Sequence, residues 1–194
     1  MDTVERKKAL RALVKARKKN LTPQEKERQA KVVAEQIWEP VTYGLIESSD
    51  YDTTLCYWAL PDELPTHDII NQLLAYKKRV VLPVVTGDEL ELFEYTGESC
   101  LQPQPPFGIL EPRGTARVDP AEIGIAIIPG VAFDEDWRRL GRGRGYYDRL
   151  FPQMPQAYKI GVCFAEQIVD CVPCEPHDVT MDWLCYENKK NHRK

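Results

Sequence analysis

The sequence predicts a single α/β domain in which a mainly parallel sheet is flanked by helices. Apolar segments rich in β-forming residues alternate with segments whose apolar residues recur at helical spacing, an order typical of parallel sheets. The 194 residues suffice for one substantial hydrophobic core and are too few for two. We therefore expect one domain over residues 1–194, with a helical N-terminal segment over 1–40 and a short basic tail over 188–194.

Two helices are expected in the first 40 residues. Leu10, Leu13 and Val14 recur at helical spacing and provide an apolar stripe. A basic stripe runs beside it, because the first 20 residues hold eight Lys and Arg residues against two acids. The second helix is expected to begin after Thr22, where a capping threonine is followed by a proline and then by Glu25.

Three strands and a helix are expected between residues 53 and 95. Residues 53–60 are rich in β-formers, and 79–85 form a short apolar run typical of a buried strand. Residues 89–95 follow a Thr-Gly-Asp turn and alternate in character. Thr66 is expected to cap the intervening helix, whose apolar residues recur at helical spacing.

The second half is expected to place a long loop at the end of a buried strand. Residues 99–120 are proline-rich and are expected to be irregular. Residues 123–128 are the most strand-like run, a helix is expected from 146–151, and late strands from 158–164 and 179–186. Ligands of open α/β sheets bind beyond the carboxyl ends of strands, so the loop after 123–128 is where a ligand is expected.

Composition excludes several classes of protein. A net charge of −4 argues against general nucleic-acid binding, and no run approaches the ~18 apolar residues of a membrane span. The start lacks an apolar signal core and carries two acids, so neither a secretory signal nor a mitochondrial leader is expected. The six scattered cysteines are expected to be reduced thiols in the cytoplasm. The Cys171–Cys174 pair has a spacing that zinc sites use, but no second pair supports one. With no obvious interface stripe, we expect a monomer.

The loop after the 123–128 strand has the features of a phosphate site. Three alternating glycines would let backbone N–H groups approach an anion: Gly141, Gly143 and Gly145. Three arginines among them offer forked donors: Arg139, Arg142 and Arg144. A helix beginning near Tyr146 would point its positive end at the same place. The pattern is neither a dinucleotide fingerprint nor a Walker loop, and a flexible surface turn is the alternative.

Five strings in order resemble the 5-formyltetrahydrofolate cyclo-ligases, also called methenyltetrahydrofolate synthetases. They are Lys7 with Arg11, then residues 59–66, 107–112, 129–148 and 172–182. Together they span residues 5 to 187. The resemblance implies a three-layer fold of the NagB/RpiA/CoA transferase-like kind.

The resemblance also implies a reaction. Members convert 5-formyltetrahydrofolate and ATP to 5,10-methenyltetrahydrofolate, ADP and phosphate, with magnesium. In the implied mechanism the formyl oxygen attacks the γ-phosphate and becomes an imidate phosphate. The folate's 10-position nitrogen then attacks the activated carbon, and phosphate leaves.

The resemblance further implies the residues that bind the nucleotide and the metal. Lys7 and Arg11 would hold phosphates from one side, and a solvated helix face is the alternative. The residues that would bind ATP from the other side are Arg139, Gly141, Arg142, Gly143, Arg144, Gly145, Tyr146 and Asp148. Asp148 and Asp182 are candidate magnesium ligands, with a first-turn helix carboxylate and a turn residue as the alternatives.

On the folate side, Glu63 would accept hydrogen bonds from the pterin, while Phe107 and Tyr147 would line the pocket. Arg142 and Tyr147 are the candidate catalytic residues.

Three nearby residues are expected to have no catalytic role. Asp134 and Asp136 are expected at the surface or in turns, and His177 is expected in loop structure, because the phosphoryl transfer needs no histidine. Two other functions stay open: a non-catalytic nucleotide- or folate-binding module, and a different α/β enzyme such as a sugar-phosphate isomerase.

Overall fold

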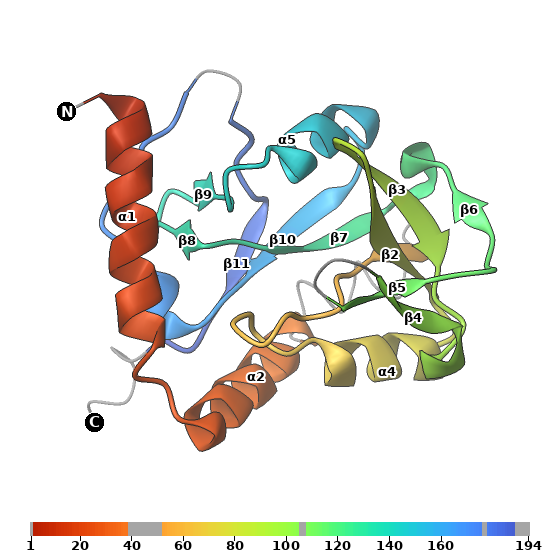
Figure 1. The fold of residues 1–194 in the computed structure, drawn as a ribbon. Helices are drawn as coiled ribbons and strands as arrows, with labels where there is room; N and C mark the ends of the chain where they lie inside the picture. Colours follow the sequence, from red (N-terminus) through yellow and green to blue (C-terminus); the bar gives the residue numbers. More distant parts are fainter. Residues whose placement is uncertain (1, 39–51, 105–107, 176–177, 189–194) are drawn as a thin grey trace.

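A seven-stranded sheet forms the centre of the computed structural model, which describes residues 2–38, 52–104, 108–175 and 178–188 (Figure 1). Its strands are β1 (Thr53–Leu55), β2 (Arg79–Thr86), β3 (Glu89–Glu94), β6 (Arg117–Val118), β7 (Ile125–Pro129), β10 (Tyr158–Val162) and β11 (Trp183–Cys185). They lie in the order β11-β10-β7-β1-β2-β3-β6. The first five run parallel, and β3 and β6 join antiparallel at one edge. This topology confirms the predicted α/β class with a mainly parallel sheet.

Helices cover both faces of the sheet. They are α1 (Thr3–Lys18), α2 (Pro23–Ile37), α4 (His67–Ala75) and the short α5 (Tyr146–Leu150). Along β7, Ile125 and Ile127 join the core beneath α2 and α4, while Ala126 and Ile128 join the core beneath α5. This alternation follows from the two-residue period of a strand, and it explains why β7 is apolar throughout.

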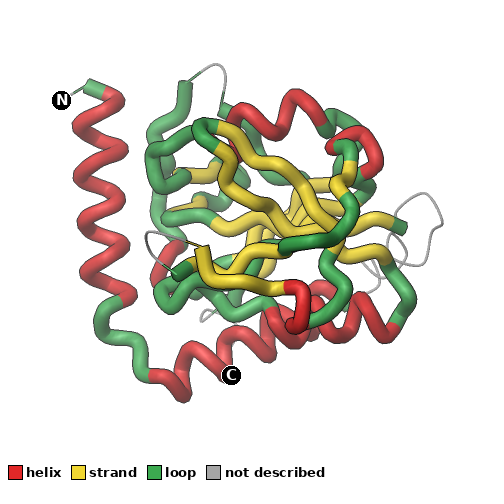
Figure 2. The backbone as a smooth tube through the Cα atoms, turned by 45° about the vertical axis from the view of Figure 1, so that its right-hand side comes forward, coloured by secondary structure: helices red, strands yellow, loops and turns green. Residues whose placement is uncertain are grey.

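The helix α1 stands upright along one end of the molecule, as Figure 2 shows. Its fully buried residue is Val14, which packs with Ala132 and Leu140 in a small separate cluster. Both N-terminal helices begin with a capping box, formed by Asp2 with Glu5 and by Thr22 with Glu25. The start predicted for α2 is therefore confirmed.

Thr66 stands before α4 as predicted, but its side chain makes no capping hydrogen bond. Its hydroxyl instead donates to the buried Tyr57 carbonyl at 2.5 Å. The donation directs the hydroxyl toward the Tyr57 carbonyl, and the Thr66 backbone (φ −113°, ψ 1°) is not the extended conformation of a capping residue, so tertiary structure overrides the local signal here.

Three predicted segments differ from the observed ones. The strand expected over 53–60 ends at Leu55, and that expected over 179–186 is confined to β11. The segment expected to be irregular contains β4 (Leu101–Gln104) paired with β5 (Ile109–Pro112), and then β6. Prolines in a strand are tolerated where no ladder donor is needed, which is why the proline count misled the prediction. In the described residues, no helix is long and apolar enough to cross a membrane.

Candidate active site

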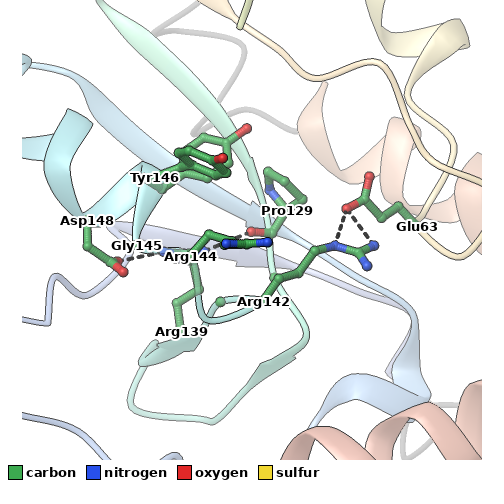
Figure 3. Close-up of a pocket in the computed structure, with 11 residues that line it drawn as sticks. Glu63, Pro129, Arg139, Arg142, Arg144, Gly145, Tyr146 and Asp148 are labelled. Atoms are coloured by element: carbon green, nitrogen blue, oxygen red, sulfur yellow. Dashed lines mark hydrogen bonds and ion pairs between the residues drawn. The ribbon is translucent and has the colours of Figure 1, made fainter. Parts of the chain in front are cut away.

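The candidate site lies at the carboxyl end of β7, where the chain leaves the sheet at Pro129 and Gly130. The next residues form a hairpin of β8 (Ala132–Phe133) and β9 (Arg139–Leu140), and then the glycine loop that leads into α5 (Figure 3). A pocket of about 100 Å³ opens here. The predicted site residues that line it are Glu63, Arg139, Gly141, Arg142, Arg144, Gly145, Tyr146, Tyr147 and Asp148.

The glycine loop has a backbone that favours glycine. Gly143 and Gly145 have φ angles of +99° and +70°, in the left-handed region that side chains disfavour. At Gly141 a Cβ would lie 3.1 Å from the Arg139 guanidinium, so the missing side chain lets that cation lie against the loop. The spacing of the glycines therefore follows from the backbone conformation of the loop and from the packing of Arg139 against it.

Arg139 is a fixed cation on the floor of the pocket. Its side chain is only 5% exposed, and Nη2 donates to Asp148 Oδ1 at 2.7 Å. The guanidinium carbon lies 5.4 Å from the ring centroids of both Tyr147 and Phe151. Stacking and the ion pair together hold its orientation.

Arg142 joins the glycine loop to the segment that follows β1. Its Nε and Nη2 donate to Glu63 Oε1 at 3.1 and 2.9 Å, and Nη2 also donates to Asp62 Oδ1 at 2.7 Å (Figure 3 shows the Glu63 contact). Burial acts to lower the pKa of Arg142, but the two carboxylates outweigh it and the pKa is raised. The pterin-binding candidate Glu63 is thus paired with a phosphate-binding candidate.

The first helix reaches the glycine loop from the other side. Arg11 Nε donates to the Gly141 carbonyl at 2.9 Å. Lys7 Nζ donates to Glu175 Oε2 at 2.9 Å and to Asp178 Oδ2 at 2.7 Å, and its side chain is 15% exposed. Both basic residues line a second cavity of about 280 Å³, which shares four lining residues with the pocket: Arg139, Gly141, Gly145 and Asp148. The structure therefore brings them to the site, and neither is on a solvated helix face.

The structure does not bring Asp182 to this site. Asp182 precedes β11, and its Oδ2 accepts from the Lys159 backbone N–H at 2.8 Å. Because β10 and β11 are parallel, this position lies at the amino edge of the sheet, opposite the end of β7. The alternative interpretation of Asp182, as a turn residue, describes its position.

Asp148 fits magnesium as a single ligand. Its side chain is 37% exposed, and Oδ1 accepts from Arg139. Magnesium typically takes one or two protein carboxylates together with phosphates and waters. Among the described residues there is no group of three or more His, Cys, Asp or Glu suited to a metal ion. Asp148 could therefore hold the ion only together with substrate phosphates.

Asp134 was expected at the surface or in a turn, and the structure separates the two. It lies in the turn between β8 and β9, as expected, but it is 1% exposed and so is not at the surface. Its carboxylate accepts from the backbone N–H groups of Asp136, Arg138 and Val172 at 2.8 to 3.1 Å. It therefore organises the turn of the hairpin from inside. Asp136 is exposed, as predicted.

Two predicted residues, Phe107 and His177, lie outside the described residues. Sequence reasoning missed the roles of Asp62, Glu175 and Asp178 as partners of the site cations. A signal was present, because each stands within a segment that resembles the family's motifs.

The fold and the site together define an α/β protein whose carboxyl-edge pocket is lined by cations and glycines, an arrangement suited to an anionic ligand. The model of the 5-formyltetrahydrofolate cyclo-ligase family matches residues 3–187, and the chain belongs to this family. It is accordingly an enzyme of the ligase class.

Curated relatives and solved structures agree with this assignment. A 5-formyltetrahydrofolate cyclo-ligase of Escherichia coli K12 is 30% identical over 177 residues, covering 87% of this chain and 93% of its own. A mouse cyclo-ligase is 27% identical and covers 94% of each chain. The 5,10-methenyltetrahydrofolate synthetase of Aquifex aeolicus superposes with a TM-score of 0.78 at 31% identity, covering 92% of this chain and 88% of its own. That of Mycoplasma pneumoniae has a TM-score of 0.73 at 26% identity, covering 94% and 99%.

Proposed function

We propose that this protein converts 5-formyltetrahydrofolate and ATP to 5,10-methenyltetrahydrofolate, ADP and phosphate, with magnesium. One observation carries the proposal beyond the family's name. Cations from α1 and from the glycine loop surround two adjoining cavities, and a carboxylate from the segment after β1 stands at the rim of the first. Such a site offers cations to a polyphosphate and an acceptor to a ring rich in N–H donors.

The chemistry requires an amide oxygen to become a leaving group. The formyl oxygen attacks the γ-phosphorus, the bond to the ADP oxygen breaks, and an imidate phosphate forms. The 10-position nitrogen then attacks the formyl carbon and loses its proton, the ring closes, and the carbon–oxygen bond breaks to release phosphate, which takes up that proton. Phosphoryl transfer depends mainly on positioning and charge neutralisation, which the fixed Arg139 and the loop N–H groups suit.

Each candidate residue has a definite task in this proposal. Lys7 and Arg11 hold phosphates from the α1 side, and Arg142 moves from its acidic partners to the transferred phosphoryl group. Asp148 would hold magnesium, which when bound neutralises phosphate charge. Asp182 is left out because of its position at the opposite edge.

On the folate side, Glu63 accepts from the pterin and Tyr147 lines the pocket. Burial raises the pKa of the Tyr147 phenol above its ordinary value. The side chain is therefore a neutral hydrogen-bonding group and not a base. The remaining loop residues, Gly141, Gly143, Arg144, Gly145 and Tyr146, contribute shape and donors to the nucleotide side.

We also propose a cytoplasmic location, which the six free thiols support, since disulfides are rare in reducing compartments. The monomeric state remains a prediction.

An absorbance assay tests the proposed reaction. Purified protein is mixed with 5-formyltetrahydrofolate and magnesium, with and without ATP, and the near-ultraviolet band of methenyltetrahydrofolate is followed. We expect the band to grow only with ATP, with one ADP formed for each methenyl product. Binding of both compounds without turnover would favour the non-catalytic module. Turnover of a sugar phosphate that ignores ATP would favour the isomerase.

A further inference from the structure

Asp62 stands beside the pocket and contacts Arg142, a cation of the pocket whose side chain is 47% exposed. It does not line the pocket that holds Glu63, yet its Oδ1 accepts from Arg142 Nη2 at 2.7 Å. On its other side, Oδ2 lies 3.3 Å from Lys18 Nζ at the end of α1. Burial acts to raise the pKa of Asp62, but Arg142 and Lys18 outweigh it and the pKa is lowered. Asp62 is thus a charged anchor held in place by a second element.

The anchor keeps Arg142 against Glu63. Both N–H donors that Arg142 gives to Glu63 go to the same oxygen, Oε1. The other oxygen, Oε2, accepts from the Leu60 backbone N–H at 3.0 Å. Both oxygens of Glu63 therefore accept hydrogen bonds in this conformation, and the Nε–Nη2 edge of Arg142, one of the edges that can bind a phosphate through two N–H groups, is turned to carboxylates.

Each substrate needs this ion pair to open. A pterin that donates two N–H groups to Glu63 must displace Arg142 from Oε1, and a phosphate that binds the Nε–Nη2 edge of Arg142 must draw it away from both acids. Whichever substrate binds first supplies the free energy that separates the pair, and the second binds to residues already released. Two binding sites that both require the same ion pair to separate are coupled, and each ligand then tightens the binding of the other by the same factor.

We propose that Asp62 is a positioning residue that holds Arg142 against Glu63 in the substrate-free enzyme, so that nucleotide and folate bind with positive cooperativity. This inference rests on the proposed function, because it needs both substrates at this site. The Arg142 and Asp62 side chains are 47% and 57% exposed, so solvent weakens their pairing. We expect each substrate to tighten the binding of the other by about 3- to 10-fold.

Calorimetry on the whole chain measures this coupling directly. The Kd of a non-hydrolysable ATP analogue with magnesium is measured with and without saturating 5-formyltetrahydrofolate, and the ratio of the two values is the coupling factor. Asp62→Asn is expected to bind the analogue alone more tightly than the wild type does, and its coupling factor should be nearer to 1. In Asp62→Glu we expect the wild-type coupling factor to return. In Arg142→Met we expect weaker nucleotide binding, tighter folate binding, and no coupling.

Asp136→Asn is the matched control, because it removes one acidic charge from an exposed side chain that contacts Arg138 outside the pocket. A general change in potential alters both Kd values together and leaves their ratio unchanged, so this variant should keep the wild-type factor.

A wild-type factor of 1 overturns the proposal, as does an unchanged factor in the folded Asp62→Asn protein. If Asp62→Asn does not fold, the Arg142→Met variant tests the proposal instead. That variant must both lose the coupling and bind folate more tightly than the wild type, and any other result overturns the proposal. Failure of either substrate to bind the wild-type protein alone is a different result, because it removes the proposed function and this inference with it.

Discussion

Asp148 is the residue on which the metal assignment rests. It stands in the first turn of α5, and its Oδ1 accepts a hydrogen bond from the buried side chain of Arg139. Its exposed part faces the cavity that also contains Lys7 and Arg11. A carboxylate placed there can complete the coordination of a phosphate-bound magnesium ion.

We expect Asp148→Asn to raise the magnesium concentration needed for half-maximal activity by about 10-fold or more, because a neutral amide is a weaker magnesium ligand. Initial rates over a magnesium series at fixed ATP measure the effect. Asp182→Asn is the control, since Asp182 lies at the opposite edge of the sheet. A shift in the Asp182 variant with none in the Asp148 variant would reverse the assignment.

The Tyr147 phenol allows a prediction about how the rate depends on pH. Its buried phenol has a pKa above the ordinary value, so it stays protonated from about pH 7 to pH 10. Tyr147→Phe should therefore leave the shape of the pH–rate profile unchanged in that range, while lowering kcat/KM by less than about 100-fold. Loss of a basic limb from the profile in this variant would show that the phenol ionises and acts in proton transfer.

At the scale of elements, the β8–β9 hairpin depends on a carboxylate hidden inside its turn. Asp134 accepts three backbone N–H groups, one of them from Val172 in a distant segment. It also lies 3.4 Å from the Arg138 guanidinium. The hairpin leads directly into the glycine loop, so the same carboxylate sets where that loop begins.

We expect Asp134→Asn to lower the free energy of unfolding by about 1–3 kcal/mol, because its amide group would face donors and leave one of them unsatisfied. Urea titration followed by circular dichroism measures the change. Asp136→Asn, two residues away and 69% exposed at its side chain, should change the midpoint very little. Equal effects of the two substitutions would contradict the role assigned to Asp134.

At the scale of the whole molecule, α1 is attached by charge more than by apolar burial. Val14 is its only fully buried residue, whereas α2 buries Val33, Ala34 and Ile37. Ion pairs and hydrogen bonds from Lys7, Arg11 and Lys18 attach α1 to the rest of the chain. Two of the residues that hold the helix in place are also the proposed phosphate ligands.

We expect α1 to exchange its amide hydrogens faster than α2 in the substrate-free protein, and to gain protection when an ATP analogue binds. Local opening is easiest where few apolar contacts must be broken, and a ligand that contacts the helix stabilises its docked state. Hydrogen exchange read by mass spectrometry tests both statements. The exchange of α2 is the internal reference, and equal gains in both helices would indicate a global effect.

The sequence by itself determined the class of fold, most of the elements, and the segments that form the site. Periodicity, the Thr22 capping box and the glycine spacing depend on residues a few positions apart, so they can be read along the chain. Resemblance to the family located Lys7, Arg11 and Glu63, whose types alone are consistent with many roles.

Only the tertiary structure decided which charges meet. The ion pair of Lys7 with Asp178 joins residues 171 positions apart, and that of Arg142 with Glu63 joins residues 79 apart. The edge of the sheet at which Asp182 lies likewise follows from the parallel register of β10 and β11. A charge in a sequence has no partner until folding brings one within a few ångströms, because screened electrostatic interactions act only at short range.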